Sequence, residues 1–461
     1  MAGERRVLVV GGGIAGLAAA IDLVDDPTLS VELWESSAML GGKIATSPFA
    51  GVEHIDEGAD AFLTRVPHAV ELARRVGLTD LTSPTDAHAA VWHNGLHDIP
   101  SGVLLGVPAS IRPFVTSDLL SWHGKLRAAA EPFLPRTDDA DDSIGALIRA
   151  RFGNEVHERL VDALVGSIYA TDTDRSSLAA VPQLADLAKR HRSLLLGARS
   201  MRLAAKPVGT GSPIFGAPRF GMAVLVDAAS RYLVDRGATS ITGRPAASIE
   251  PNGQGWLVND EPFDALVLAT PSRTTARFLK PIAPAASSAL AEFEHADIVM
   301  VRLAIPETDW PERLRGRSGY LVPKPAQQHV TAASFGSQKW AHWRPDDGAQ
   351  IVRISLGRDG SPIMHLGDDE IIEAVLEEVG RHLGIDLQPI QISITRWPDA
   401  FPQYRPYHHN RVAAVESALP DRVALAGASY RGIGIPACIA DGQRAAATIK
   451  QSIAIADGLL P

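Results

Sequence analysis

The glycines near the start of the chain have the spacing of a phosphate-binding turn. The apolar stretch Val7 to Val10 runs directly into Gly11-Gly12-Gly13-Ile14-Ala15-Gly16, so Gly11, Gly13 and Gly16 occupy the glycine positions of G-x-G-x-x-G. One glycine makes the tight turn, one lets backbone approach a pyrophosphate, and one allows a helix to pack closely on a strand. The helix after Gly13 presents unpaired N–H groups and its positive dipole end to the phosphates.

An acid follows the next apolar stretch, Ser30 to Trp34. Glu35 comes 19 residues after Gly16, where it can accept hydrogen bonds from ribose hydroxyls. An ordinary tight turn would explain the glycines alone, but not the order of strand, glycine motif, helix, strand and acid. The sequence therefore predicts a dinucleotide-binding unit.

Two further segments suit contacts to a cofactor. In Gly41-Gly42-Lys43 the glycines let the backbone pass close to a ligand, and Lys43 is able to bond the ligand or a carboxylate. The run from Asp56 to Phe62 combines acids with small residues, which suits backbone contacts to a flat ring. Taken alone, each segment is equally compatible with a solvated turn.

An aromatic run and a basic run offer candidates for a substrate site. Arg396 to Tyr404 is rich in aromatics and prolines for a solvent loop, which suits either a rigid wall beside a planar ligand or interdomain packing. The stretch from Lys189 to Arg219 contains seven cations and no acid. These cations suit an anionic substrate, a membrane or an acidic partner, although a solvated basic helix face is the common alternative. The seven are Lys189, Arg190, Arg192, Arg199, Arg202, Lys206 and Arg219.

Other chemistries have little support. No histidine pair, His408-His409 included, has metal-ligand spacing with supporting acids, so no metal site is predicted. The single cysteine, Cys438, excludes an internal disulfide and is expected to pack in the core. The chain has 44 Lys and Arg against 53 Asp and Glu, a net charge of −9, which disfavours nucleic acid as a partner. We therefore expect a cytoplasmic protein and no membrane-spanning segment.

The fold class predicted from these patterns is α/β, with a discontinuous Rossmann-like domain. Later fragments of that domain are expected at Ser240-Ile241, Ala246 to Ile249, Trp256 to Val258, Ala265 to Pro271 and Val423 to Ala426, the last followed by a helix containing Ala445 to Ala447. The insertion from Ala87 to Gly216 shows helical periodicity, with Asp142-Ser143 as a cap. The insertion from Lys280 to Tyr407 offers strands at Ile298 to Ala304, Ile351 to Leu356 and Ile390 to Thr395, and a helix from Asp368 to Leu383.

The predicted domains are three. The dinucleotide domain takes residues 1–68, 216–285 and 416–461; a mixed-sheet substrate domain takes 69–86, 187–215 and 286–415; and a helical lobe takes 87–186.

In order along the chain, several motifs resemble the flavin-dependent porphyrinogen oxidases, and most closely the bacterial coproporphyrinogen III oxidases. The motifs are G-G-G-I-A-G-L, W-E-S, G-G-K, E-G-A-D-A-F, N-G-L-H-D-I-P-S-G, G-S-I-Y-A, R-W-P-D-A-F-P-Q-Y and A-G-A-S-Y-R-G-I-G-I-P-A-C-I. They span almost the whole chain and are far more specific than the glycine turn. The resemblance implies the fold of the amine oxidase and porphyrinogen oxidase type and non-covalent FAD.

The resemblance also implies site residues. The pyrophosphate is assigned to Gly11, Gly12, Gly13, Ile14, Ala15 and Gly16, the ribose to Glu35 and Ser36, further cofactor contacts to Lys43, Gly58, Ala59, Asp60 and Ala61, the adenine to backbone near Ala246, and the flavin to Trp397 and to a cap from Ile433, Gly434 and Ile435. Two positions depart from the family pattern: Ala59 replaces a usual proline and Ala437 a usual acid, which puts loop rigidity and one polar contact in doubt.

The implied reaction oxidises coproporphyrinogen III to coproporphyrin III in haem biosynthesis, with hydride transfer from a bridging methylene to the flavin and dioxygen giving hydrogen peroxide. Tyr169 is predicted to lie near the reacting carbon, with a packed helix tyrosine as the alternative, and Arg219 or the basic run to bind substrate carboxylates. A ferrochelatase is the implied recipient of the product, and peripheral membrane contact is left open. The alternatives are a protoporphyrinogen oxidase, a flavin amine oxidase or carotenoid desaturase, and a non-catalytic escort protein of the same fold.

Overall fold

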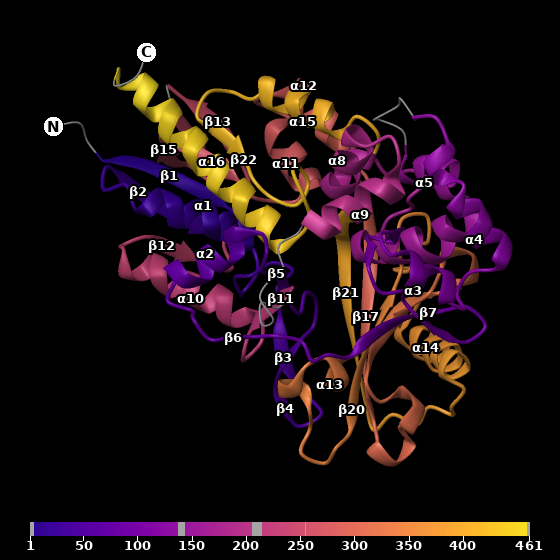
Figure 1. Ribbon diagram of the computed structural model, residues 1–461. Coiled ribbons are helices and arrows are strands. Elements are labelled where there is room, and N and C mark those ends of the chain that lie inside the picture. The colour runs from indigo at the N-terminus through magenta and orange to yellow at the C-terminus, as the bar shows by residue number, and fades with distance from the viewer. Residues whose placement is uncertain (1–3, 137–142, 205–213, 254, 459–461) are drawn as a thin grey trace.

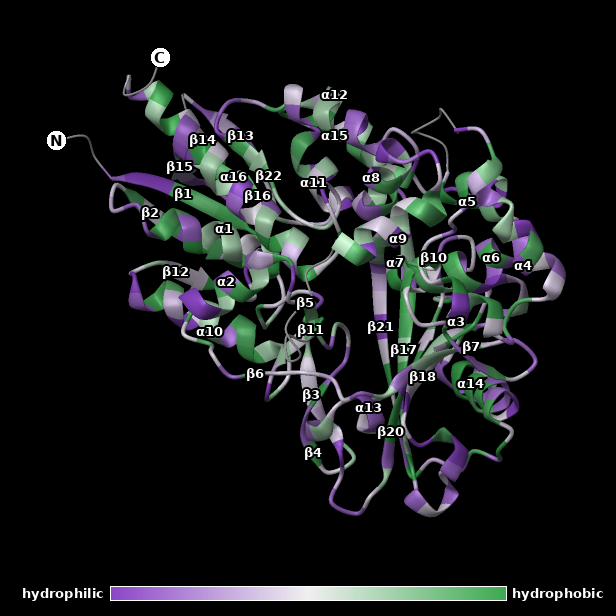
Figure 2. Cartoon of the chain, viewed as in Figure 1, coloured by the Kyte–Doolittle hydropathy of each residue, from purple (hydrophilic) through white to green (hydrophobic). Residues whose placement is uncertain are grey.

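A computed structural model describes residues 4–136, 143–204, 214–253 and 255–458 of the 461-residue chain. Two large sheets lie side by side, with a group of helices beside the second (Figure 1). Hydrophobic residues predominate along β1 and β17, while the outer loops are more hydrophilic (Figure 2).

The first sheet is parallel and contains the N-terminal strand. Its order is β12 (Thr239–Ile241), β2 (Leu29–Trp34), β1 (Arg5–Val10), β16 (Ala265–Leu268) and β22 (Val423–Leu425). Strands from three distant parts of the chain thus form one sheet, which confirms the discontinuous Rossmann-like architecture. The predicted strand from Ala246 to Ile249 is wrong at its start, because β13 (Ile249–Asn252) begins at its last residue.

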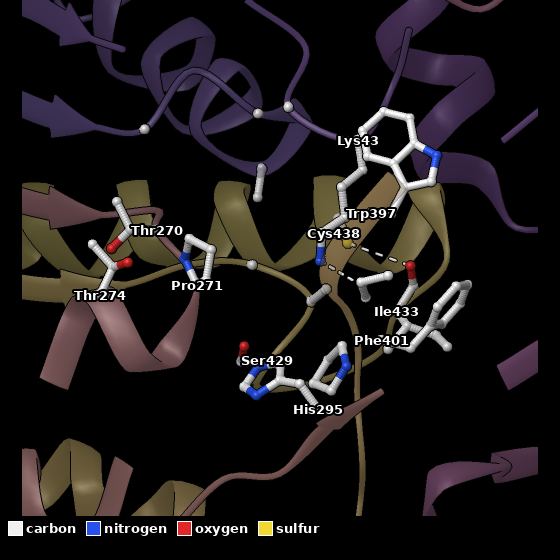
Figure 3. A pocket seen from close by; sticks show the side chains of 18 of the residues that line it. Lys43, Thr270, Pro271, Thr274, His295, Trp397, Phe401, Ser429, Ile433 and Cys438 are labelled. Carbon is white, nitrogen blue, oxygen red and sulfur yellow. Dashed lines mark hydrogen bonds between the residues drawn. The ribbon is translucent and has the colours of Figure 1, made fainter. Parts of the chain in front are cut away.

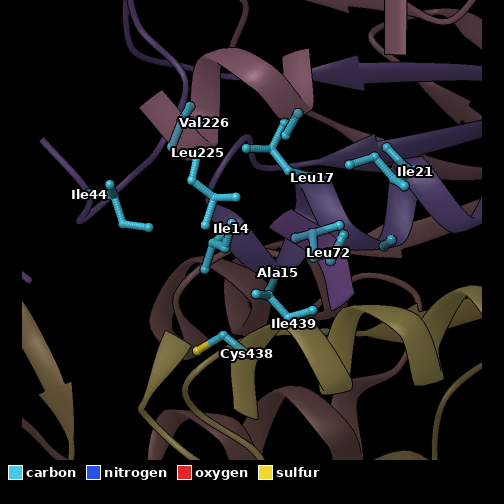
Figure 4. Close-up of a cluster of buried hydrophobic side chains, with 14 of the residues drawn as sticks. Ile14, Ala15, Leu17, Ile21, Ile44, Leu72, Leu225, Val226, Cys438 and Ile439 are labelled. Carbon is cyan, nitrogen blue, oxygen red and sulfur yellow. The ribbon is translucent and has the colours of Figure 1, made fainter. Parts of the chain in front are cut away.

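Helices cover one face of this sheet. They are α1 (Ile14–Val24), α2 (Pro67–Arg75), α10 (Ala223–Asp235) and α16 (Ile435–Ala456). Small and apolar side chains of α1, such as Ala15, Leu17 and Ile21, pack between Leu225 of α10 and Ile439 of α16 (Figure 4). This packing fixes the start of α1, and therefore the glycine turn that precedes it.

The opposite face carries a small antiparallel sheet and three helices. They are β13, β14 (Gly255–Val258), β15 (Glu261–Phe263), α11 (Ser272–Leu279), α12 (Pro284–Ala291) and α15 (His408–Ser417). The predicted pairing across the Asn252-Gly253 turn is confirmed, with Pro251 opposite Trp256.

The second sheet is mixed and has seven strands. Its order is β21 (Gln391–Pro402), β17 (His295–Ile305), β20 (Gln350–Leu356), β19 (Val330–Phe335), β18 (Arg317–Leu321), β7 (His88–Trp92) and β8 (Leu96–Asp98). One face is covered by α14 (Asp368–Leu383), which has three acids in its first turn and ends at Gly384 in the left-handed conformation. This helix and the three predicted strands are confirmed, but the last strand extends beyond Thr395, since Arg396 to Pro402 of the aromatic run also belong to β21.

The predicted helical stretch from Ala87 begins instead with strands. β7 and β8 join the second sheet, because β7 pairs in parallel with β18 more than 200 residues later. Helices follow: α3 (Ile111–Thr116), α4 (Trp122–Ala129), α5 (Ile144–Phe152), α6 (Asn154–Val156), the π-helix η2 (His157–Gly166), α7 (Ser167–Tyr169), α8 (Pro182–Arg190) and α9 (Leu194–Ala204). Ser143 caps α5 as predicted, while Asp142 lies outside the described residues. α8 and α9 share this lobe's core, although the predicted boundary at residue 187 placed the end of α8 and all of α9 in the substrate domain.

The remaining elements are short. They are β3 (Thr46–Phe49) paired with β4 (Val52–Asp56), β5 (Phe62–Leu63) and β6 (Leu81–Thr82) on either side of β11 (Phe215–Pro218), β9 (Val103–Leu104) paired with β10 (Val107–Pro108), α13 (Gly336–Lys339), and the 3₁₀ turns η1 (Glu131–Phe133), η3 (Leu178–Ala180), η4 (Glu307–Asp309), η5 (Glu312–Leu314), η6 (Lys324–Ala326) and η7 (Ala341–Trp343). The exact division into three domains stays a prediction.

Candidate functional site

A long cavity of about 1140 Å³ runs between the two sheets. It is lined by the glycine turn, by Trp34, Glu35 and the segment 244–250 beside the first sheet, and by strands of the seven-stranded sheet. Its volume exceeds the roughly 300–1,000 Å³ of ordinary ligand pockets, so it has room for a large cofactor and a second molecule.

Each of the three motif glycines is required for a different structural reason. Gly11 has φ +108°, and a Cβ there would lie 2.6 Å from the carbonyl oxygen of Ala269. A Cβ on Gly16 would lie 1.9 Å from the carbonyl oxygen of Gly11, so Gly16 allows α1 to pack on the turn. A Cβ on Gly13 would meet nothing within 4 Å, and Gly13 lines the cavity. Only this last position leaves its space to a ligand.

Two helices present their N-termini to the cavity. Gly13 precedes α1 and Gly434 precedes α16, and neither helix has a side chain that caps its first N–H groups. Ile14 and Ile435, the first residues of these helices, line the cavity. Unpaired N–H groups and the helix dipoles therefore favour negative charge at two places along it.

Glu35 directly follows β2 and lies beside the glycine turn. Its carboxylate accepts from the backbone N–H of Gly12 at 2.7 Å and from the N–H and hydroxyl of Ser37, each at 2.8 Å. Burial alone would raise the pKa of Glu35, but these hydrogen bonds outweigh it and hold that pKa below its usual value. A charged carboxylate with lone pairs to spare fits the predicted ribose contact.

Lys43 reaches across to the second sheet. Its Nζ donates to the carbonyl oxygens of Asp399, at 2.8 Å, and Ala400. Burial lowers the pKa of Lys43 to about 8, although Cys438 and Asp399 act to raise it. Lys43, Trp397 and Cys438 gather at one side of the cavity (Figure 3). Lys43 therefore joins the two sheets next to the ligand space.

The Gly58 segment follows β4 and faces Trp397. Gly58 and Ala59 line the cavity, and a Cβ on Gly58 would lie 3.6 Å from the Trp397 ring. The indole Nε1 of Trp397 is buried and without a partner. Asp60 does not line the cavity: it accepts from Lys339 Nζ at 2.7 Å and Trp340 Nε1 at 3.1 Å. The predicted cofactor contact of Asp60 therefore stays a prediction, and its carboxylate is engaged by Lys339 and Trp340 instead.

Most residues predicted for the cofactor line the cavity. They are Gly11, Gly13, Ile14, Ala15, Glu35, Ser36, Lys43, Gly58, Ala59, Ala246, Trp397, Ile433 and Ile435. Those that do not are Gly12, Gly16, Asp60, Ala61 and Gly434. Gly12 packs on Leu40 and Glu35, and Gly16 packs on Gly11, so both shape the turn from behind.

The predicted substrate residues lie elsewhere. Tyr169 lies outside the large cavity, in a small hollow beside Tyr404 and Ile433, where burial raises its pKa. Arg219 is 64% exposed and 4.0 Å from Asp80. None of the described residues of the basic run lines the cavity, and Lys206 lies outside the described residues. The roles suggested for Tyr169 and Arg219 therefore stay predictions without a contact to the large cavity.

Cavity residues on the second sheet were missed. Ile298, Met300, Ser334, Arg353 and Ser355 line the cavity from three neighbouring strands. Alternation along a strand shows which residues share a face of the sheet. It does not show which of the two faces meets a ligand. The thiol of Cys438 also lines the cavity, and burial raises its pKa to about 12, so it stays protonated at neutral pH.

Asp56, at the end of β4, gives a testable dependence on pH. Burial raises its pKa from 3.8 to about 6, against the opposing hydrogen bonds from Thr46 and the Met222 N–H. Because the folded-state pKa is raised, the stability that Asp56 contributes is fully present below pH 3.8 and is lost, by about 3 kcal/mol, as pH rises through 6. The side chain in Asp56→Asn cannot titrate. We therefore expect the free energy of unfolding of this variant to rise relative to that of wild type between pH 4 and pH 7. Urea unfolding of both proteins at pH 4 and pH 7 measures this change. An equal difference between variant and wild type at the two pH values would contradict the raised pKa of Asp56.

Metal and membrane signals are absent from the part of the chain described here. No group of three or more His, Cys, Asp or Glu side chains among the described residues is arranged to hold a metal ion. No described helix is long and apolar enough to cross a bilayer.

Comparison with known proteins agrees with this geometry. Residues 14–450 match the model of the flavin containing amine oxidoreductase family. The chain is 32% identical to the coproporphyrinogen III oxidase of Bacillus subtilis over 96% of its own length and 97% of that protein's. It is 32% identical to that of Mycobacterium tuberculosis, over 97% and 98%.

A solved structure is also close. The chain superposes on a crystal structure from Exiguobacterium sp. 255-15 with a TM-score of 0.85 and 26% identity, covering 97% of this chain and 99% of the other. The chain therefore belongs to the flavin containing amine oxidoreductase family, within the group that includes the coproporphyrinogen III oxidases.

Proposed function

We propose that this chain oxidises coproporphyrinogen III to coproporphyrin III with FAD, passing electrons to dioxygen and releasing hydrogen peroxide. The family match and the nearly full-length relatives named for this activity support the proposal. The observation that carries it is the continuous cavity, which joins a dinucleotide cradle to a wide chamber over the seven-stranded sheet.

The cradle fits FAD on the chemistry of its own residues. Two uncapped helix N-termini suit the pyrophosphate and an electron-rich ring, and the space at Gly13 is open to a ligand. The buried, unpaired Nε1 of Trp397 offers one hydrogen-bond donor at the chamber. Glu35 and Ser36 would hold the ribose, Gly11, Gly13, Ile14 and Ala15 the pyrophosphate, and Ile433 and Ile435 would cover the ring.

In the chamber, the protein's task is to position a flat tetrapyrrole. Ile298, Met300, Trp397 and Phe401 offer an apolar surface that excludes water from the reacting methylene. When bound, FAD supplies the two-electron acceptor. The pyrroles beside the methylene stabilise the developing cation and release an N–H proton, so the site needs no acid or base. Three such oxidations remove six hydrogens, and each consumes one dioxygen and yields one hydrogen peroxide.

The test is aerobic turnover by the purified protein. We expect a yellow protein that converts coproporphyrinogen III to a fluorescent porphyrin, with peroxide rising in step. Protoporphyrinogen IX, which has two fewer carboxylates, is run beside it. A strong preference for protoporphyrinogen would overturn the substrate assignment. Bound flavin without porphyrin product would favour an amine or polyene substrate, and a protein without flavin would favour the escort alternative.

Membrane contact and handover of the product to a ferrochelatase belong to the same proposal. Trp122 and Leu126 of α4 and Phe133 are exposed apolar side chains, and Lys125 lies between the first two. Such a surface suits the headgroup region of an anionic bilayer. Co-sedimentation with anionic and neutral vesicles tests the contact, and sedimentation unchanged by Trp122→Ala would refute this surface.

A further inference from the structure

The floor of the chamber is the uncovered face of the seven-stranded sheet. Met300 of β17 lies opposite Ser355 of β20, and one pair along the same face Arg302 lies opposite Arg353. Arg353 in turn faces Ser334 of β19. Side chains alternate between faces, so these residues point away from the core that α14 covers. The floor thus changes from apolar at Ile298 and Met300 to polar at Arg353 and Ser334.

Arg353 has one free edge on its guanidinium. Nη1 donates to the carbonyl oxygen of Asp56 at 3.0 Å, whereas Nε is buried without a partner. The nearest carboxylate oxygen to Nη2, that of Asp60, is 3.9 Å away, beyond hydrogen-bond distance. Nε and Nη2 lie on one edge of the guanidinium, and this edge is the fork that binds a carboxylate through two parallel hydrogen bonds. The side chain is only 9% exposed, and the residue lines the cavity.

The acids near Arg353 are already engaged. Asp60 accepts from Lys339 and Trp340. Burial would raise the pKa of Asp60, but the charges of Lys339 and Arg353 outweigh it and hold that pKa well below its usual range. The carboxyl of Asp56 faces Thr46 and the Met222 N–H. Among the described residues, no carboxylate fills the Arg353 fork.

The other arginines near the floor differ. Both Nη atoms of Arg358 donate to the carboxylate of Asp162, at 3.0 and 3.2 Å, and Nη2 also donates to the carbonyl oxygen of Thr171. Arg302 lies 3.6 Å from Glu57 and does not line the cavity. The acids that line the cavity, Glu35 after β2 and Glu250 in β13, come from the dinucleotide domain and not from the seven-stranded sheet. The Arg353 end of the chamber therefore favours an anion.

We propose that Arg353, supported by Ser334 and Ser355, docks a carboxylate of the substrate through its Nε and Nη2. The inference rests on the proposed function, whose substrate carries propionates around a flat ring. It places the apolar ring over Met300 and one carboxylate at the far end of the floor. Arg353 is then a specificity-determining residue, and it takes the role that the sequence suggested for Arg219 and the basic run.

The test compares binding of coproporphyrin III with binding of its neutral tetramethyl ester, in dilute detergent, to the flavin-loaded protein. We expect Arg353→Gln to weaken binding of the acid about 10- to 100-fold, since a charged, paired hydrogen bond is lost. Binding of the ester is expected to stay within about twofold, because the apolar floor is unchanged. Arg353→Lys keeps the charge without the fork and is expected to fall between the two.

Arg219→Gln is the matched control, since Arg219 is exposed outside the cavity. It should change neither affinity. An equal loss for acid and ester in Arg353→Gln would indicate a structural role and overturn the proposal, as would an unchanged acid-to-ester ratio. Flavin absorbance and thermal unfolding check that each variant is folded and loaded.

The two proposals can fail separately. If wild type oxidises coproporphyrinogen III but Arg353→Gln leaves the ratio of acid to ester affinity unchanged, only the docking assignment is overturned. If wild type binds neither porphyrin and oxidises neither porphyrinogen, the proposed function falls as well. For an active wild type, we expect Arg353→Gln to raise KM for coproporphyrinogen III far more than it lowers kcat, because docking acts on binding.

Discussion

Replacing Gly13 with valine is expected to give a folded protein that purifies without its yellow colour. In the structure, a Cβ at Gly13 meets nothing within 4 Å, so the protein itself tolerates the side chain. The space it would fill is cavity, directly before the first turn of α1. A branched side chain there would separate the pyrophosphate from the helix N–H groups and overfill the site. Overpacking of about 1–3 kcal/mol corresponds to a loss of FAD affinity of roughly 10- to 100-fold.

Gly16→Val provides the contrasting variant. Its Cβ would lie 1.9 Å from the carbonyl oxygen of Gly11, and because the backbone fixes the position of Cβ, no rotamer relieves the clash. We expect loss of flavin together with a loss of stability of about 3 kcal/mol or more. Absorbance near the flavin maximum per protein, with urea unfolding in the absence of added FAD, separates the two effects. Full flavin content in Gly13→Val would contradict the predicted pyrophosphate position.

The parts of the fold that were predictable have strong local patterns. β1, α1 and β2 follow from apolar strands around a glycine turn, and α14 from its periodicity and acidic first turn. The placement of β7 and β8 was not predictable, because β7 pairs with β18 more than 200 residues away, β8 joins the sheet only through β7, and composition does not identify such a partner. The segment from Ala87 was predicted to be helical because of the periodicity of the helices that follow these two strands.

The site divides in the same way. Residues fixed by a turn, such as Gly13 and Glu35, line the cavity where the motif predicts them. Arg353 looks like any alternating strand residue in the sequence, and only pairing with β17 and β19 reveals that it faces the chamber. Arg219 attracted attention as part of a basic run, yet exposed cations are the ordinary state of arginine. Charge density along the chain is therefore a weaker guide to a buried anion site than the absence of an acid partner in space.

The buried pair of Asp162 and Arg358 should dominate the stability of the contact between the helical lobe and the sheet. Asp162 lies in the π-helix η2 and is 1% exposed, and it accepts from Thr173 at 2.6 Å and from Arg358 at 3.0 and 3.2 Å. Asp162→Ala would leave the Arg358 charge buried and uncompensated. We expect a loss of about 3–5 kcal/mol in urea unfolding.

The double variant Asp162→Ala with Arg358→Met tests the cause. If the cost is an unpaired charge, removing both charges should destabilise less than the sum of the single variants, with a coupling of about 0.5–3 kcal/mol. Asp186→Ala is the control, because Asp186 and Arg190 form an exposed pair on α8, and it should cost no more than about 0.5 kcal/mol. Gly166 ends the same π-helix and lines the cavity, so the loosened variant should also bind porphyrin more weakly. A single-variant cost near that of the control would mean that water reaches the pair, and the lobe would then be held by its apolar core alone.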